Sequence, residues 1–100
     1  MTAIRIGTHP GEILREAFMI PLGLSANALA RALGVPPNRI TAIVAADNPR
    51  AVTPDTALRL ARYFGTTPEL WLNLQLAYDL SAAIAHRGAR IEAAVQPRAA

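Results

Sequence analysis

Apolar residues recur three and four positions apart along most of this chain, which is the spacing of helices that bury one face. The first segment with this spacing starts at Pro10 and is expected to end at Pro21, because proline is tolerated in a first helical turn but interrupts a helix further along. Its predicted buried face consists of Ile13, Leu14, Ala17 and Phe18.

A second helix and a sharp corner follow this segment. Ser25 is a favourable N-cap for a helix that runs to Leu33. Gly34 can adopt the left-handed conformation that closes a helix, and Pro36 pushes the residue before it into an extended conformation. The sequence therefore predicts a tight turn directly after Leu33.

A third helix is predicted from Pro37 to about Ala46. Several of its residues are β-branched and favour a strand, but the apolar positions 40, 43 and 44 fit a helical face and do not alternate. Two short helices joined by a tight turn form a helix-turn-helix. The residues expected to hold the pair together are Leu29, Ala30, Leu33, Val35, Ile40, Ile43 and Val44.

Two further helices begin with a threonine followed by a proline. Thr53 precedes a fourth helix that Gly65 ends, and Thr67 precedes a fifth helix. The predicted buried face of the fourth helix consists of Ala57, Leu58, Ala61 and Phe64. The sequence predicts no strand, so the expected fold is all-α, with a five-helix domain over residues 1–85 and a flexible tail over residues 86–100.

The fifth helix is apolar on two sides, so it needs two surfaces to pack against. One side carries Leu70, Leu74, Ala77 and Ser81, flanked by Trp71, Tyr78 and Ile84. We expect Trp71 to be a packing anchor and not a base-stacking residue. The opposite side carries the predicted dimer interface, which consists of Leu72, Leu76 and Leu80.

Positive charge is concentrated in the middle of the chain. The formal net charge is +3, and the charges cancel within residues 1–24 and within residues 66–100. Within residues 25–65 only Asp47 and Asp55 oppose an excess of arginine, which suits a partner that carries phosphate groups. These arginines are Arg31, Arg39, Arg50, Arg59 and Arg62.

Few side chains suited to catalysis are available. The chain has no cysteine, and its two histidines, His9 and His86, lie near opposite ends. This composition argues against a thiolate metal site and against histidine-based catalysis, so we expect no metal, no cofactor and no enzymatic activity. The N-terminus lacks the apolar core of a signal peptide, and no apolar run is long enough for a bilayer, so a cytoplasmic protein without a membrane partner is expected.

The outward face of the third helix carries side chains that can read base edges. Asn38 can form two hydrogen bonds with adenine, Arg39 can do the same with guanine, and the methyl group of Thr41 can contact thymine. The alternative is an ordinary helical hairpin without a ligand. The candidate DNA-binding residues are Ser25, Asn27, Arg31, Pro37, Asn38, Arg39, Thr41, Ala42, Ala45 and Arg50.

Several stretches together resemble the HigA/VapI-type antitoxins of the Cro/C1 helix-turn-helix class, over about residues 8–80. The stretches that carry the resemblance are His9-Pro10-Gly11-Glu12, Pro21-Leu22-Gly23-Leu24-Ser25, Leu29-Ala30-Arg31-Ala32-Leu33-Gly34-Val35-Pro36-Pro37-Asn38-Arg39-Ile40, Thr53-Pro54-Asp55-Thr56-Ala57-Leu58-Arg59-Leu60 and Phe64-Gly65-Thr66-Thr67-Pro68-Glu69-Leu70-Trp71-Leu72-Asn73-Leu74-Gln75.

The resemblance implies a dimeric five-helix domain without catalysis. Such a protein binds a palindromic operator upstream of its own operon and neutralises a toxin that is an mRNA-cleaving ribonuclease. The chain departs from the family in the loop after the third helix, where Ala45–Arg50 is longer than usual and contains Asp47 and no lysine. A carboxylate near phosphates opposes DNA binding, so we expect an altered approach of this loop to DNA.

The first helix is the predicted contact with the toxin. An RNA-cleaving toxin is expected to be basic, and Glu12 and Glu16, with Arg15 between them, form the densest acidic pair in the chain. Two alternatives to an antitoxin stay open. The chain could be a stand-alone repressor of the Cro/C1 type without a toxin, or a helical protein-interaction module whose corner is only structural.

Overall fold

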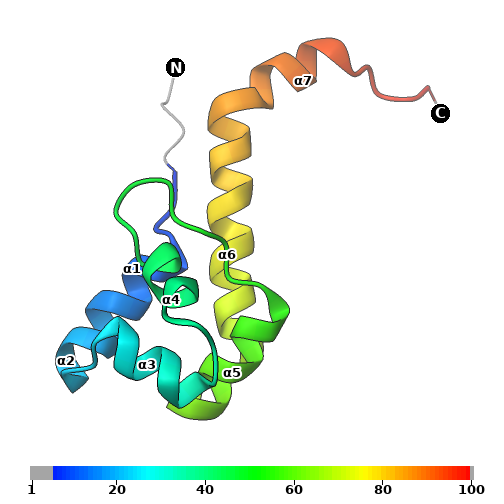
Figure 1. Ribbon diagram of the computed structural model, residues 1–100. Coiled ribbons are helices and arrows are strands. Elements are labelled where there is room, and N and C mark those ends of the chain that lie inside the picture. The colour runs from blue at the N-terminus through cyan, green and yellow to red at the C-terminus, as the bar shows by residue number, and fades with distance from the viewer. Residues whose placement is uncertain (1–5, 100) are drawn as a thin grey trace.

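The computed structural model describes residues 6–99, which fold into helices without a strand (Figure 1). α1, η1 and α2 follow one another without a break, as do α6, η2 and α7, so the predicted all-α fold of five helices is confirmed. The elements are α1 (Pro10–Ile13), η1 (Leu14–Met19), α2 (Ile20–Leu22), α3 (Ala26–Leu33), α4 (Pro37–Ile43), α5 (Pro54–Phe64), α6 (Pro68–Ala83), η2 (Ile84–Gly88) and α7 (Ala89–Ala94).

The first helix differs from its prediction because its middle, η1, is a π-helix. In a π-helix residues five apart share a face, so Leu14 and Met19 are both buried. The predicted buried face is wrong at Ala17, which is exposed. The predicted end at Pro21 is also wrong. Pro21 lies inside α2, and the helix closes at Gly23, whose φ angle is 64°.

The helix-turn-helix is formed by α3 and α4, which pack against each other. The Oγ of Ser25 accepts a hydrogen bond from the Ala28 N–H (3.0 Å), and Gly34 closes α3 with a φ angle of 72°. α4 ends at Ile43, three residues before the predicted Ala46, because Val44 leaves the helical conformation (φ −89°, ψ 3°).

α5 and α6 begin as predicted, with Thr53 and Thr67 as N-caps. The predicted buried face of α5 is wrong at Leu58, which is 61% exposed, whereas Leu60 is fully buried. Leu58 follows the buried Ala57 directly, and a helix turns by about 100° between consecutive residues, so Leu58 faces away from the core.

The C-terminal segment is helical as far as Ala94, so the predicted tail over residues 86–100 is wrong in its secondary structure up to that residue. Gly88 has right-handed angles (φ −57°, ψ −50°) and therefore does not end the helix. Figure 1 shows α7, in orange to red, turning away from the axis of α6. All residues of α7 are exposed, and the division into a domain over 1–85 and a flexible tail over 86–100 stays a prediction.

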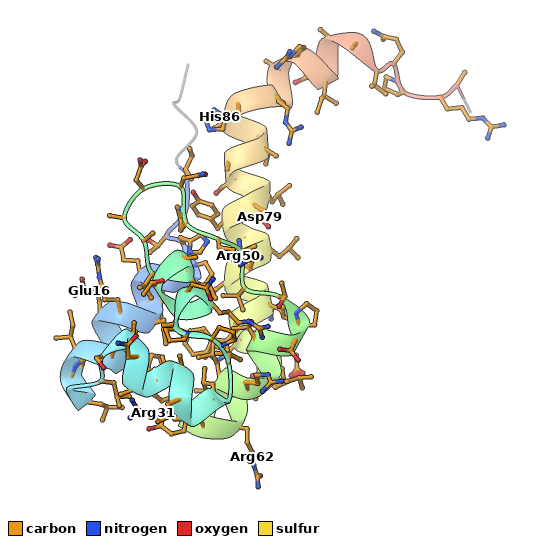
Figure 2. All side chains as sticks on the ribbon, in the orientation of Figure 1. Glu16, Arg31, Arg50, Arg62, Asp79 and His86 are labelled. Carbon is orange, nitrogen blue, oxygen red and sulfur yellow. The ribbon has the colours of Figure 1, made fainter. Side chains whose placement is uncertain are left out.

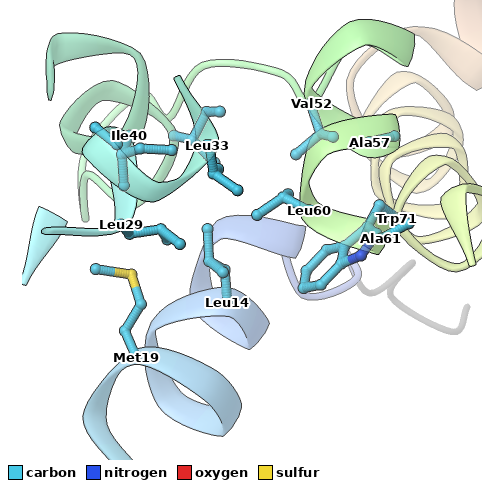
Figure 3. Close-up of a cluster of buried hydrophobic side chains, with 12 residues drawn as sticks. Leu14, Met19, Leu29, Leu33, Ile40, Val52, Ala57, Leu60, Ala61 and Trp71 are labelled. Carbon is cyan, nitrogen blue, oxygen red and sulfur yellow. The ribbon is translucent and has the colours of Figure 1, made fainter. Parts of the chain in front are cut away.

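The core lies where the five helical segments meet (Figure 3). Leu14, Leu29, Ile40, Leu60 and Trp71 are fully buried, and each comes from a different segment. Trp71 is 0% exposed within this core, so the prediction that it is a packing anchor is confirmed. Its indole N–H donates a hydrogen bond to Thr66 Oγ1 (2.9 Å).

Among the described residues, no helix is by itself long and apolar enough to cross a membrane. One bent pair, Pro10–Leu22 with Ala26–Leu33, reaches that length and hydropathy together, and the two helices meet at 98°.

Candidate nucleic-acid interface

α4 presents a short polar surface to solvent. Pro37, Asn38 and Thr41 are exposed, and Ala42 is half-buried. The hydroxyl of Thr41 donates to the backbone oxygen of Asn38 (3.3 Å). Because both residues are exposed, the Thr41 methyl group and the Asn38 amide are candidate base contacts. α4 therefore carries five of the predicted DNA-binding residues, the fifth being Arg39.

The start of α3 adds a second polar surface. Ser25 and Asn27 are exposed, and so is Arg31, which Figure 2 shows on α3. Because the Oγ of Ser25 caps the helix, the Ser25 side chain already uses its acceptor in the fold. The N-terminus of an eight-residue helix carries partial positive charge, which favours a phosphate group near Ser25 and Asn27.

Arg39 is engaged in an ion pair within the protein. Its Nη1 lies 2.6 Å from Asp55 Oδ2, and Arg59 Nε lies 2.9 Å from the same oxygen. Hydrogen bonds from Arg59 and Arg39 hold the pKa of Asp55 below its usual value. Arg39 is predicted to contact a base, whereas in the structure its guanidinium group binds the carboxylate of Asp55 on α5.

Asp55 is thus a residue of the interface region that sequence reasoning missed. The available signal was its place as one of two acidic residues in the arginine-rich segment 25–65. Beside it lies a cleft of about 290 Å³ between α4 and α5, lined by Arg39, Arg50 and Arg59 together with threonine side chains. Asp55 lines the same cleft and pairs with Arg39 and Arg59, so Arg50 is the guanidinium group of this cleft that Asp55 leaves available to a phosphate group.

Residues 14–71 match the family model described as helix-turn-helix. The chain belongs to the helix-turn-helix family. It is similar to virulence-associated protein I of Dichelobacter nodosus, with 60% identity over 75 residues, which are 75% of this chain and 68% of that protein.

Solved structures of antitoxins have the same fold as this helix-turn-helix protein. An addiction module antidote protein of the HigA family from Coxiella burnetii is 51% identical with a TM-score of 0.84, over 94% of this chain and 100% of that one. Pseudomonas aeruginosa antitoxin HigA with the higBA promoter is 42% identical with a TM-score of 0.86, over 95% of this chain and 100% of that one. The resemblance to HigA/VapI-type antitoxins is therefore confirmed.

The loop after α4 of this helix-turn-helix protein folds back onto the helix. The Arg50 N–H donates to the Ala42 oxygen (2.9 Å), which anchors Arg50 beside α4, and Asp47 is exposed at the loop tip. Ala45 lies beyond the end of α4, so its predicted place on the outward face of that helix is wrong. Ala45 instead lines a cleft of about 430 Å³ that also contains Glu12 and Arg15.

The predicted toxin-contact residues lie together on the first helix. Glu12 and Glu16 are exposed, and Arg15 Nη2 lies 3.1 Å from Glu16 Oε1. An exposed ion pair of this kind contributes little to stability, so it leaves Glu16 available to a partner, as exposure does for Glu12. Figure 2 shows Glu16 projecting from this helix.

The predicted dimer interface is only partly exposed. Leu76 and Leu80 are 65% and 56% exposed on α6, whereas Leu72 is half-buried and packs against the core. Leu72 lies close to the buried Trp71, which draws the start of α6 into the core and leaves the later turns free. Among the described residues, no group of three histidine, aspartate or glutamate side chains could hold a metal ion.

Proposed function

We propose that this chain is the DNA-binding antitoxin of a toxin–antitoxin pair, and that it represses its own operon and neutralises an mRNA-cleaving ribonuclease. The observation that carries the DNA-binding part is the exposed polar face of α4 beside the cleft that collects Arg39, Arg50 and Arg59. The likeness to HigA antitoxins, one of them solved with promoter DNA, supports both parts of the proposal.

In this proposal α4 lies in the major groove of the operator. Asn38 hydrogen-bonds a base edge, and the Thr41 methyl group contacts an adjacent base. Arg31 and Arg50 lie on either side of α4 in the sequence and bind backbone phosphates without regard to sequence. A two-fold dimer formed through α6 would set two recognition helices about 34 Å apart, so the half-sites would lie one helical turn apart.

The experiment compares two variants on two duplexes. One duplex comes from the region upstream of this protein's own coding sequence, and the other has the same length with a shuffled sequence. Asn38→Ala is expected to cost about 1–3 kcal/mol of binding free energy on the upstream duplex and little on the shuffled one. Arg50→Ala is expected to weaken binding to both duplexes alike. It should also reduce, by about one, the slope of the logarithm of the binding constant against the logarithm of the salt concentration. Arg87→Ala, on an exposed turn of η2, is the matched control.

Two other outcomes would point to the alternatives. If the wild type binds neither duplex, the chain is a helical protein-interaction module. If it binds DNA but captures no product of an adjacent gene, it is a stand-alone repressor without a toxin. The operator and the mRNA that the toxin cleaves are both found in the cytoplasm of a bacterium, so the proposal places the protein in that compartment.

The proposed toxin contact lies on the first helix. Glu12 and Glu16 give this surface a negative charge that suits a basic ribonuclease, while the arginines of residues 25–65 serve the DNA. The division of charge between two surfaces would let one chain bind DNA and toxin through different residues. The proposal includes no catalytic step by the antitoxin itself and no cofactor.

A further inference from the structure

One carboxylate oxygen connects the recognition helix to the rest of the helix-turn-helix. Asp55 Oδ2 accepts hydrogen bonds from Arg39 Nη1 (2.6 Å) and from Arg59 Nε (2.9 Å). Arg59 also donates from Nη1 to the Leu33 oxygen (2.8 Å) at the end of α3. A continuous chain of bonds therefore runs from α4 through Asp55 on α5 to the C-terminus of α3.

These bonds act where α4 has little other support from α5. The backbone of α4 packs chiefly against α3, while α5 packs chiefly against α6. Arg39 extends from α4 to Asp55 in the first turn of α5, and its side chain is 35% exposed. The orientation of α4 relative to α5 thus depends on this contact as well as on the apolar core.

We propose that Asp55 is a positioning residue for operator recognition, which holds Arg39 and the whole of α4 in the orientation that reads bases. The proposal rests on the proposed DNA-binding function and adds a residue that contacts no base. It also reassigns Arg39 from a base contact to a link between α4 and α5.

Simple electrostatics predicts the opposite effect for Asp55. Its carboxylate lines the same cleft as Arg50, and a negative charge close to backbone phosphates weakens binding to every DNA sequence. Removing the charge should therefore strengthen binding if Asp55 has no positioning role. If Asp55 positions α4, removing it should weaken binding to the upstream duplex while binding to shuffled DNA is unchanged or stronger.

Asp47 provides the matched control. It carries the same charge in the loop between α4 and α5, it is exposed, and it takes part in none of the ion pairs among residues 6–99. Asp47→Asn and Asp55→Asn therefore remove equal charge near the same surface. The two variants differ in the loss of the bonds to Arg39 and Arg59.

The experiment measures dissociation constants of the full chain for the upstream and shuffled duplexes over a range of salt concentrations. Asp47→Asn should strengthen binding to both duplexes alike. The ratio of the dissociation constant for shuffled DNA to that for the upstream duplex should therefore stay that of the wild type. Asp55→Asn should lower this ratio about tenfold, comparable to the loss of one specific base contact. Arg39→Ala should lower the same ratio equally. The double variant should lower it no further, because both substitutions break the same bond between Arg39 and Asp55.

Asp55→Glu keeps the charge on a longer side chain and should give an intermediate ratio. It also replaces Asp55→Asn if melting curves show that the latter does not fold. Two results would overturn the positioning role while the DNA-binding function stands. One is that Asp55→Asn strengthens binding to both duplexes. The other is that adding Arg39→Ala to Asp55→Asn lowers the ratio of the two dissociation constants further. A wild type that does not discriminate between the duplexes would overturn both proposals.

Discussion

The backbone of Gly11 lies directly against the carbonyl group of Ile43. A Cβ atom on Gly11 would stand 1.9 Å from the Ile43 oxygen and 2.8 Å from the Ile43 carbonyl carbon. Since both atoms belong to the backbone, no side-chain rotation could make room for it. The start of the first helix therefore contacts the last residue of the recognition helix, although the two are far apart in the sequence.

Gly11→Ala should displace α4 and destabilise the fold by about 1–3 kcal/mol, which is the usual cost of overpacking. Unfolding in urea measures this change, and binding to the upstream duplex should weaken in parallel. Gly7→Ala is the control, because its Cβ would come no closer than 3.5 Å, to Ser81 Oγ. Equal stability of the Gly11 variant and wild type would show that α4 shifts freely.

Gln75 holds the segment before α5 through one buried hydrogen bond. Its Oε1 accepts from the Val52 N–H (2.8 Å), and both residues are buried. Gln75→Leu leaves that N–H without a partner and should cost about 1–3 kcal/mol of folding free energy. Asn73→Leu, an exposed position on the same helix, should change stability little in the same urea titration. Similar curves for both variants would contradict the role of this bond.

His9 should make stability depend on pH. Its Nδ1 accepts a hydrogen bond from the Gly11 N–H (2.9 Å), which requires that nitrogen to be unprotonated, and burial lowers the pKa of His9 below the usual 6.5, while Asp79 partly opposes this shift. Because the unfolded chain then binds the proton more readily, this contribution is fully present above about pH 6.5 and is lost as the pH falls.

The measurement is the free energy of unfolding at several values between pH 8 and pH 5. His9→Asn keeps an N-capping side chain that does not titrate in this range, so part of the pH dependence should disappear. His86→Asn changes an exposed histidine and should leave the wild-type dependence in place. A His9→Asn curve parallel to that of wild type would assign the dependence to other groups.

The exposed leucines of α6 should form the dimer interface. Leu76→Glu should shift the protein toward monomer in sedimentation and reduce affinity for the upstream duplex, because a buried charge in an apolar interface is unfavourable. Leu58→Glu is a close control, since Leu58 is 61% exposed and Leu76 65%. Monomeric wild type at tens of micromolar, or equal dissociation by both variants, would rule out this interface.

The acidic surface of the first helix should contribute to toxin binding. Glu12→Lys/Glu16→Lys should slow association with the product of the adjacent gene, with the larger effect at low salt. Glu69→Lys/Glu92→Lys makes the same charge change on exposed positions of α6 and α7 and should leave association unchanged. Capture as efficient as that of wild type at physiological salt would place the toxin contact elsewhere.

Much of the fold depends on local signals that are visible along the chain. Ser25, Thr53 and Thr67 cap their helices as predicted, because a cap needs only its own side chain and the next few backbone N–H groups. Gly34 closes α3 in the left-handed conformation for a similarly local reason. The two proposed partners, DNA and toxin, were also indicated by charge and by family resemblance.

Where local signals compete with packing, the prediction fails. Ala17 was assigned to the core by regular helical spacing, but the π-helical turns of η1 bring Met19 there instead. A flexible tail is predicted from residue 86, but the helix continues through Gly88 to Ala94, because glycine permits the left-handed conformation without requiring it. Neither outcome could be derived from residue preferences alone.

Local signals along the chain suffice to predict the order of the helices, the position of the tight corner and the exposure of Asn38 and Thr41 on α4. Which distant residues meet depends on the packing of the helices, as for Gly11 with Ile43, Gln75 with Val52 and Asp55 with Arg39. The difference lies in the distance along the chain over which each interaction acts. A cap or a turn is set by atoms a few residues apart, whereas these contacts depend on how helices pack in space, and that arrangement is a property of the whole core.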